Sequence, residues 1–265
     1  MDPMIPIAEL PGGIRLPYVE RGDPLGVPVV FLHGVTDSWR AFEPVLAHLP
    51  AGIRAIAVTQ RGHGEATRPE SGYGIGDLAG DVAAFFDALG IDAAVVVGHS
   101  MGTAVAQRFA AEHPQRVRAL MLIGAFHSLA GNEGVHEIWS TVSQLQDPVD
   151  PQFVRDFQAG TSFQPLAPEF LDMVVGESLK LPARVWRALF EGFLHDRGPR
   201  FEQWSAPTAI LWGEQENICM RADQDQLLER FPDARFVAVP QVGHSVHWEK
   251  PELVARELAA LVART

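Results

Sequence analysis

GHSMG, at residues 98–102, marks the central turn of this chain. It follows an apolar run at residues 94–97 and precedes a run of small residues, so we expect a buried strand to end, and a helix to begin, at Ser100. A tight turn of this kind projects the serine hydroxyl outward and brings the residues two before and two after into close contact. Both must then be small, and Gly98 and Gly102 meet that demand. Ser100 is therefore a candidate nucleophile, although many serines at such a place only cap a helix.

Short β-branched runs alternate with amphipathic segments on both sides of this turn. The runs predict strands over residues 29–32, 53–58, 94–97, 117–123, 208–212 and 235–239. The amphipathic segments predict helices over residues 77–89, 101–113, 222–231 and 251–262. This alternation is typical of an α/β fold in which helices cover both faces of a mainly parallel sheet. The alternating run at residues 14–20 is expected to add an antiparallel edge strand.

The alternation is interrupted over residues 126–205, which contain no clear buried strand. This segment is rich in aromatic residues and proline, and its apolar residues recur at helical spacing between 185 and 193. We expect several short helices that form a cap over the sheet. Residues 1–125 and 206–265 would then form the core of the domain, and residues 126–205 the helical cap.

Composition and charge narrow the possible partners. The chain carries 21 basic and 33 acidic side chains, and the net charge of −12 opposes binding to nucleic acid or to an anionic membrane. No apolar run approaches the ~20 residues of a membrane span, and the first residues lack the basic head and apolar stretch of a signal peptide. A single cysteine, Cys219, excludes an intramolecular disulfide. We expect a cytoplasmic monomer or homodimer that acts on a small molecule.

A serine hydroxyl is a poor nucleophile without a base, and a histidine base needs a carboxylate to hold its tautomer. His244 follows the strand expected at residues 235–239 after a short loop, which places it at the same carboxyl edge of the sheet as Ser100. A lone loop histidine is usually only solvated, so this position is what favours His244. The carboxylate can come from Glu214 or Glu216, which follow the preceding strand.

Acyl transfer through a tetrahedral intermediate also needs two amide donors for the oxyanion. The amide of Met101, directly after Ser100, is one candidate, because it opens the following helix. The other is the amide of Val35, in the loop after the strand expected at residues 29–32. Gly34, the residue before it, permits the close backbone approach that such a donor requires.

These features together resemble the α/β-hydrolase superfamily, in particular its single-domain members with a helical cap. The resemblance rests on motifs that run in the family's order over nearly the whole chain. They are His33-Gly34, Arg61-Gly62-His63-Gly64, the GHSMG turn, Leu211-Trp212-Gly213, Gly243-His244 and Glu249-Lys250-Pro251. The resemblance implies an α/β-hydrolase fold with an inserted cap. These motifs specify the fold far better than the substrate.

Two positions depart from the family pattern. The family usually places aspartate three residues after the glycine that closes the strand before the acid turn, and here Glu216 takes that place. The site that some relatives use instead, after the strand at 117–123, holds no carboxylate before Glu133. The resemblance therefore favours Glu216 as the acid. Thr59 stands where the family often has aspartate before the motif at residues 61–64, and we interpret that motif as a structural turn with an ion-pair anchor.

The expected activity is hydrolysis of an ester or lactone of a small, largely apolar molecule, with Ser100 as nucleophile, His244 as base and Glu216 as acid. A serine nucleophile argues against the haloalkane dehalogenases and epoxide hydrolases of the superfamily, which use aspartate. A carbon–carbon bond hydrolase or a cofactor-free perhydrolase could use the same three residues. Outside catalysis, the alternative is a ligand-sensing receptor or regulator with little turnover.

The aromatic cap predicts an apolar pocket. We expect the substrate to contact His33 and Gly34 from the core and Trp186 and Phe190 from the cap, and we expect His247 to form part of the pocket wall or a helix cap. No metal or cofactor is expected, because the sequence has no H-E-x-x-H motif, no cysteine pair and no phosphate-binding G-x-G-x-x-G after a strand.

Overall fold

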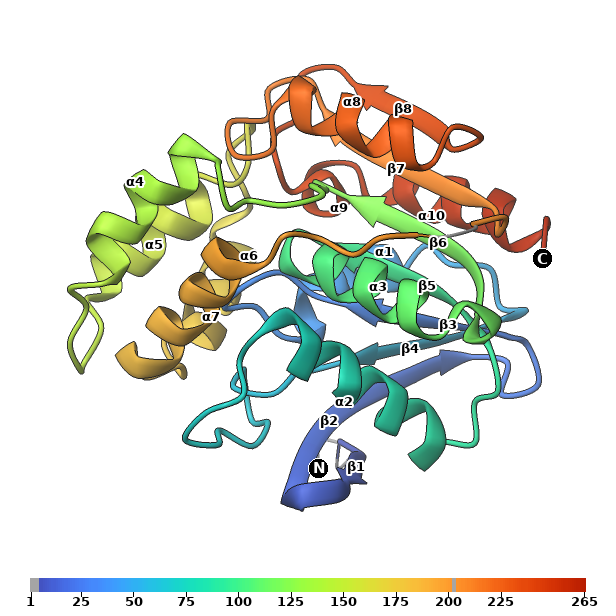
Figure 1. Ribbon diagram of the computed structural model, residues 1–265, viewed down its shortest axis with the longest axis horizontal. Coiled ribbons are helices and arrows are strands. Elements are labelled where there is room, and N and C mark those ends of the chain that lie inside the picture. Colours follow the sequence, from blue (N-terminus) through green and yellow to red (C-terminus); the bar gives the residue numbers. More distant parts are fainter. Residues whose placement is uncertain (1–4, 202–203) are drawn as a thin grey trace.

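The computed structural model describes residues 5–201 and 204–265; residues 1–4 of the predicted core and 202–203 of the predicted cap lie outside the described residues. Strands and helices alternate along the chain as the sequence predicts (Figure 1). The strands are β1 (Ile7–Leu10), β2 (Ile14–Gly22), β3 (Val27–Leu32), β4 (Ile53–Val58), β5 (Ala94–His99), β6 (Val117–Ile123), β7 (Thr208–Gly213) and β8 (Arg235–Val239). They form an eight-stranded sheet in the order β1-β2-β4-β3-β5-β6-β7-β8.

The sheet is parallel from β4 across to β8, which confirms the predicted α/β architecture. β2 is the predicted antiparallel strand, and it pairs with β4. It does not form the edge, however, because β1 pairs with its outer side in a second antiparallel ladder. β1 has only four residues, which is too short for a clear periodic signal in the sequence.

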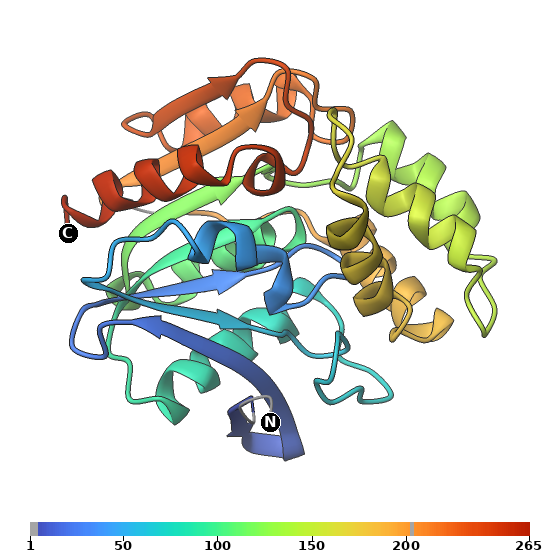
Figure 2. The ribbon, with the colours of Figure 1, turned by 180° about the vertical axis from the view of Figure 1, so that it is seen from behind.

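Helices cover both faces of the sheet. The helices toward the viewer in Figure 1 are α2 (Ile75–Ala88), α3 (Met101–Glu112) and α8 (Arg221–Arg230), and those toward the viewer in Figure 2 are α1 (Glu43–Leu46), α9 (Val246–Glu249) and α10 (Pro251–Val262). Short 3₁₀ turns are η1 (Pro11–Gly13), η2 (Trp39–Phe42) and η3 (Pro114–Arg116). Along β3, Val30 and Leu32 pack into the first layer, whereas Val29 and Phe31 pack into the second. None of the described helices is long and apolar enough to cross a membrane.

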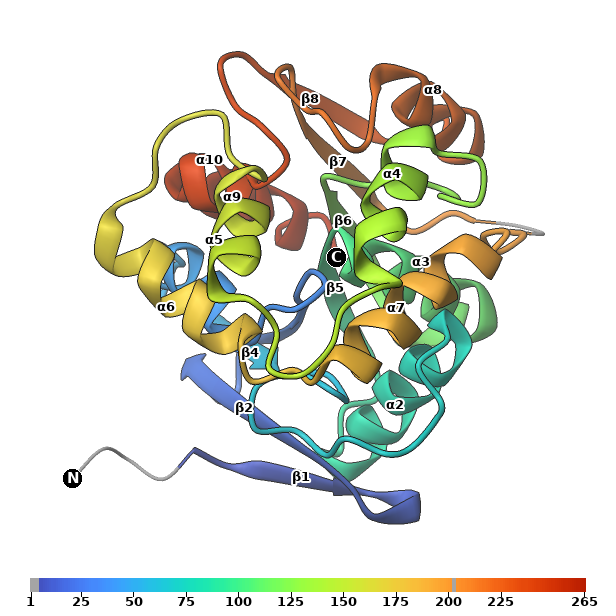
Figure 3. The same ribbon diagram turned by 90° about the vertical axis from the view of Figure 1, so that its left-hand side faces the viewer.

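The segment between β6 and β7 folds into helices that lie beyond the carboxyl ends of the parallel strands (Figure 3). They are α4 (Glu133–Val142), α5 (Pro151–Ala159), α6 (Pro168–Ser178) and α7 (Ala183–His195). Pro151 and Pro168 each open a helix at its first turn, where a missing amide hydrogen removes no helical bond. Asp150 caps α5 by accepting a hydrogen bond from the Gln152 amide. These prolines therefore begin helices and do not break them.

The motif at residues 61–64 has contacts that fit a structural role. Arg61 forms a two-pronged ion pair with Asp81 of α2 and donates a further hydrogen bond to the Gly72 carbonyl. Gly62 has a φ of 84°, and a Cβ there would lie 2.7 Å from the ring of Tyr73. The motif thus fixes the loop after β4 against α2.

The turn between β5 and α3 is crowded on both sides. A Cβ on Gly98 would lie 2.4 Å from the Gly102 carbonyl oxygen, and a Cβ on Gly102 would lie 2.0 Å from that of Leu32. Ser100 has φ 49° and ψ −117°, a conformation that residues with a side chain rarely adopt. Its amide donates a 3.0 Å hydrogen bond to the Ile123 carbonyl, which ties the turn to β6. The demand for small residues at both positions is therefore confirmed.

Gly102→Ala should destabilise the protein by about 1–3 kcal/mol, because the added methyl group overlaps a backbone carbonyl that cannot rotate away. Gly80→Ala in α2 is the matched control. A Cβ there meets nothing within 4 Å, so the higher helix propensity of alanine should stabilise the protein by up to about 1 kcal/mol. Chemical denaturation of both variants makes the measurement. Unchanged stability of Gly102→Ala would contradict the crowding of this turn.

Candidate active site

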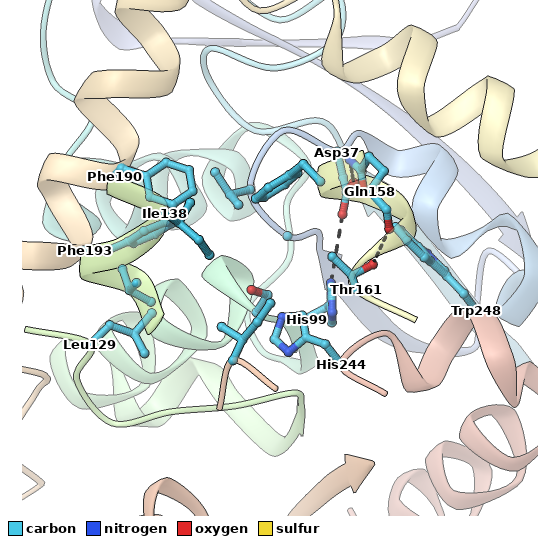
Figure 4. Close-up of a pocket in the computed structure, with 16 residues that line it drawn as sticks. Asp37, His99, Leu129, Ile138, Gln158, Thr161, Phe190, Phe193, His244 and Trp248 are labelled. Atoms are coloured by element: carbon cyan, nitrogen blue, oxygen red, sulfur yellow. Dashed lines mark hydrogen bonds and ion pairs between the residues drawn. The ribbon is translucent and has the colours of Figure 1, made fainter. Parts of the chain in front are cut away.

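Ser100 lies at the carboxyl edge of the sheet and lines a cavity beneath the helical segment. Figure 4 shows this cavity, with His244 among the residues around it. Val35, from the loop after β3, and His244, from the loop after β8, line the same cavity. Three distant parts of the chain meet here because parallel strands end at one edge of a sheet. Within the described residues, the Ser100 hydroxyl makes no hydrogen bond, so it is free to meet a ligand.

His244 is held by a buried carboxylate. Its Nδ1 lies 2.7 Å from Glu216 Oε2, and both side chains are buried. The other carboxylate oxygen accepts hydrogen bonds from the amides of Ile218 at 2.8 Å and Cys219 at 3.1 Å. These amides hold Glu216 inward, whereas Glu214 is exposed. Since an ionised carboxylate only accepts hydrogen bonds, His244 Nδ1 carries the proton and Nε2 presents a lone pair.

Glu249 positions the loop that carries His244. Its carboxylate accepts hydrogen bonds from the amides of Gly243 at 2.8 Å, Gln164 at 2.9 Å and Phe163 at 3.1 Å. It therefore ties the histidine loop to the loop between α5 and α6. In the sequence Glu249 is only part of a motif, and nothing there indicates the two loops that it joins.

The two amides expected to bind an oxyanion have no hydrogen-bond partner in the described part of the chain. Met101 is the first residue of α3, and no helical acceptor exists for an amide in the first turn. Val35 lies in a loop, and within residues 5–201 and 204–265 neither its amide nor that of Met101 donates to a protein acceptor. Both amides are therefore free to bind a ligand.

His33 fixes the loop that carries Val35. Its Nε2 accepts a 3.0 Å hydrogen bond from the Gln60 amide, so Nδ1 carries the proton and donates to the Gly34 carbonyl at 2.8 Å. Burial, and then the nearby His63, holds the pKa of His33 well below its usual range, so the ring stays neutral. Gly34 lines the cavity, but His33 does not, which differs from the expectation. Both ring nitrogens of His33 form hydrogen bonds with the backbone, so neither is available to a ligand.

One wall of the cavity is apolar. Its residues are Leu129, Val135, Ile138, Phe157, Phe190, Phe193 and Ile218. Trp186 is not among them, contrary to the expectation. It is fully buried behind this wall, with its ring centroid 5.3 Å from that of Phe157 and 6.5 Å from that of Phe190. Trp186 thus supports the lining rings from the interior of the helical segment.

A polar group that the sequence did not reveal also lines the cavity. Asp37 is 3% exposed, and its Oδ1 accepts a 3.0 Å hydrogen bond from Gln158 Nε2. Burial raises the pKa of Asp37 to about 7, although the hydrogen bond from Gln158 and the nearby His244 act in the opposite direction. The only feature of the sequence that could have pointed to Asp37 as a residue of the site is its position, two residues after Val35. Gln158 comes from α5, and no sequence pattern connects it with this loop.

His99 and His247 are buried neighbours whose ring centroids lie 4.1 Å apart. Burial is the main reason why the pKa of each lies well below its usual range, so both rings are neutral. His99 lines the cavity and His247 does not. His247 packs against Phe42 of η2, so it supplies neither pocket wall nor helix cap, in contrast to the expectation.

Glu216, Cys219 and His244 are a group that could hold a metal ion, because their ligand atoms lie within 4.8 Å of one another. Burial, however, raises the pKa of the Cys219 thiol well above its usual range, and metal binding requires the thiolate. The carboxylate and the imidazole are already bonded to each other. The group therefore fits a histidine–carboxylate pair better than a metal centre.

Asp37→Asn should stabilise the protein increasingly as the pH rises. In the wild type, the Asp37 carboxyl has a pKa of about 7 in the folded state, above its ordinary 3.8. Between these two pH values the folded state holds a proton that the unfolded state has lost, so the wild type becomes less stable as the pH rises from about 4 to about 7. Asparagine has no such charge to bury. The gain should vanish near pH 4 and reach at most about 4 kcal/mol above pH 7. Thermal or chemical unfolding of both proteins across this range makes the test; a difference independent of pH would contradict it.

Comparison with known proteins places this architecture in a family. A model of the alpha/beta hydrolase fold matches residues 27–193. A 2-(acetamidomethylene)succinate hydrolase of Mesorhizobium japonicum is 27% identical over 95% of this chain and 92% of that protein. The esterase RhEst1 from Rhodococcus sp. ECU1013 is 27% identical, with a TM-score of 0.84 and 98% of each chain covered. An esterase from Exiguobacterium antarcticum, 21% identical, shares the fold with a TM-score of 0.86 over 98% of this chain and all of that one. The chain belongs to the alpha/beta-hydrolase fold family.

Proposed function

We propose that this protein is a serine hydrolase that cleaves an ester or lactone of a small, largely apolar molecule through an acyl-enzyme on Ser100. One observation carries the proposal. Ser100 lines the same cavity as His244, whose Nδ1 is held 2.7 Å from the buried carboxylate of Glu216. The hydrolases among the relatives support a hydrolytic activity.

Acylation would begin with transfer of the Ser100 proton to His244 Nε2 while Oγ bonds to the carbonyl carbon. Glu216 holds the ring in the tautomer that leaves Nε2 unprotonated, and its charge stabilises the imidazolium that forms. Because both side chains are buried, water screens this attraction little. The bond from serine to histidine can form when substrate binds, since such contacts are often open in the free enzyme.

The oxyanion that develops needs donors already in place. The amides of Val35 and Met101, which have no acceptor among the described residues, would be those donors, and the positive end of the α3 dipole adds to them. Collapse of the intermediate breaks the carbon–oxygen bond, and the departing alcohol takes the proton from His244. A water molecule then gives a proton to His244 and attacks the acyl carbon. The bond from Ser100 Oγ to that carbon breaks, and His244 returns the proton to Oγ, which releases the acid and restores the free enzyme.

The lining of the cavity supports an uncharged substrate. Its apolar wall suits an alkyl or aryl group, and no lysine or arginine of the described residues lines the cavity. A substrate with several carboxylates, such as the succinate derivative in the name of the Mesorhizobium relative, would find no cationic partner here. We therefore place neutral esters and lactones first.

Ser100→Ala should lower kcat for p-nitrophenyl esters by several orders of magnitude, since members of such a catalytic group act as a unit. A phosphonate that reacts with activated serines should label Ser100 and abolish activity. Ser140→Ala, which changes an exposed serine on α4, is the control and should keep full activity. Labelling of another residue would refute the assignment of Ser100 as the nucleophile. Equally slow turnover by the wild type and by Ser100→Ala would favour a ligand sensor over an enzyme.

Glu216→Gln should lower kcat by up to ~10⁴, because the histidine loses its tautomer and the imidazolium its counter-charge. Glu214→Gln is the matched control, two residues away and exposed, and should be nearly normal. The measurement is kcat of both variants on one ester. Normal activity of both would mean that a serine–histidine pair works without this acid.

A further inference from the structure

The cavity has two chemically different walls. Figure 4 shows Leu129, Ile138, Phe190 and Phe193 on one side and Asp37, Gln158 and Thr161 on the other, where Trp248 also lies and to which His99 and His244 are close. We call the first group, with Val135, Phe157 and Ile218, the apolar wall, and Asp37, Gln158 and Thr161 the polar wall. The cavity thus combines a surface that excludes polar atoms with one that presents them.

Asp37 presents a second carboxylate oxygen that no side chain of the described residues uses. Its Oδ1 accepts from Gln158, whereas Oδ2 has its nearest ring nitrogen, His99 Nδ1, at 4.0 Å, beyond hydrogen-bond distance. No lysine or arginine of the described residues lines the cavity to neutralise the carboxylate. Asp37 lines the cavity, so a donor from a ligand can reach this oxygen and form a charge-assisted hydrogen bond with it.

The other polar atoms of this wall also favour a donor. Gln158 Nε2 is already used, by Ser178 Oγ at 2.7 Å, Asp37 Oδ1 at 3.0 Å and Thr36 Oγ1 at 3.2 Å. The Gln158 side-chain oxygen accepts no hydrogen bond within the described residues. Thr161 gives its hydroxyl hydrogen to the Gln158 backbone carbonyl at 2.8 Å. With Asp37 ionised, the wall therefore offers acceptors, while the donors of Gln158 and Thr161 are already used.

We propose that Asp37 and Gln158 form a subsite that binds a hydroxyl group of the substrate. The substrate is then an ester or lactone with an apolar group on one side of the reacting carbonyl and a hydroxyl-bearing group on the other. This proposal rests on the hydrolase function proposed above. A carboxylate fits less well, because it has no hydrogen to give to Asp37 Oδ2 and is repelled by the ionised form of that carboxyl. A hydroxyl fits better than an ammonium group, because a neutral donor enters this largely apolar cavity at a lower desolvation cost than a full charge.

The test compares esters that differ only by a hydroxyl in place of a methyl group. One pair carries it on the alcohol side, glycol monobutyrate against propyl butyrate, and the other on the acyl side, methyl β-hydroxybutyrate against methyl isovalerate. In one pair the hydroxylated ester should have a kcat/KM about tenfold higher, as expected for a hydrogen bond to an ionisable group. Asp37→Leu should abolish this preference, and Asp37→Asn, which keeps the shape and one acceptor oxygen, should reduce it. Ile138→Val on the apolar wall is the control and should leave the preference intact.

Binding separates this proposal from the hydrolase function. With Ser100→Ala, calorimetry should show about tenfold tighter binding of the preferred hydroxylated ester than of its match, and Asp37→Leu should remove the difference. Equal binding within both pairs would overturn the subsite, even if the wild type hydrolyses all four esters. Aminoethyl butyrate that binds more tightly than glycol monobutyrate would also overturn it, in favour of a cation site. A hydroxyl preference in binding without any turnover would uphold the subsite and refute the hydrolase.

Discussion

The close approach of β3, β5 and α3 at Gly98 and Gly102 is the constraint on which the site depends. Neither position has room for a Cβ, and the turn between them holds Ser100 at φ 49°. A strained backbone conformation persists only where the surrounding structure stabilises it by more than the strain costs. Here the surroundings are buried parallel strands, so folding itself sets the serine at the edge of the sheet. Val35 and Met101 line or adjoin the same edge, and their amides meet no acceptor in the part of the chain that the structure describes.

Two buried carboxyl groups near Ser100 have opposite surroundings. Glu216 receives two amide hydrogen bonds and faces His244, so its environment suits a charge that must balance an imidazolium. Asp37 accepts one side-chain hydrogen bond, from the neutral amide of Gln158, and burial raises its pKa to about 7 even though this bond and the backbone of Gly34 act to lower it. Environments that separate two carboxyl groups in this way give them different roles. In our account one group serves the base and the other recognises the substrate.

The sheet was largely predictable because buried β-branched runs give a strong signal: residues 53–58, 117–123 and 235–239 are strands with the expected bounds. β1 was missed because four residues carry too little periodicity. Position at strand ends pointed to Ser100 and His244, yet burial, which the sequence does not show, separates Glu216 from Glu214. Trp186 was expected to face the substrate, but it lies buried behind the rings that line the cavity. The spacing of apolar residues predicts a helix without showing which of them point into a cavity. Asp37 and Gln158 could not be paired, since they lie 121 residues apart in segments without a shared pattern.

The most direct test of the account is rapid-quench mass spectrometry of the wild-type protein during turnover of a p-nitrophenyl ester. We predict a burst of nitrophenolate equal to the enzyme present, together with a mass increase of one acyl group on the peptide that contains Ser100. The acyl group should disappear as substrate is exhausted. Steady turnover with no burst and no acylated peptide, or an acyl group on another residue, would contradict the central claim that the turn at Ser100 supplies the nucleophile.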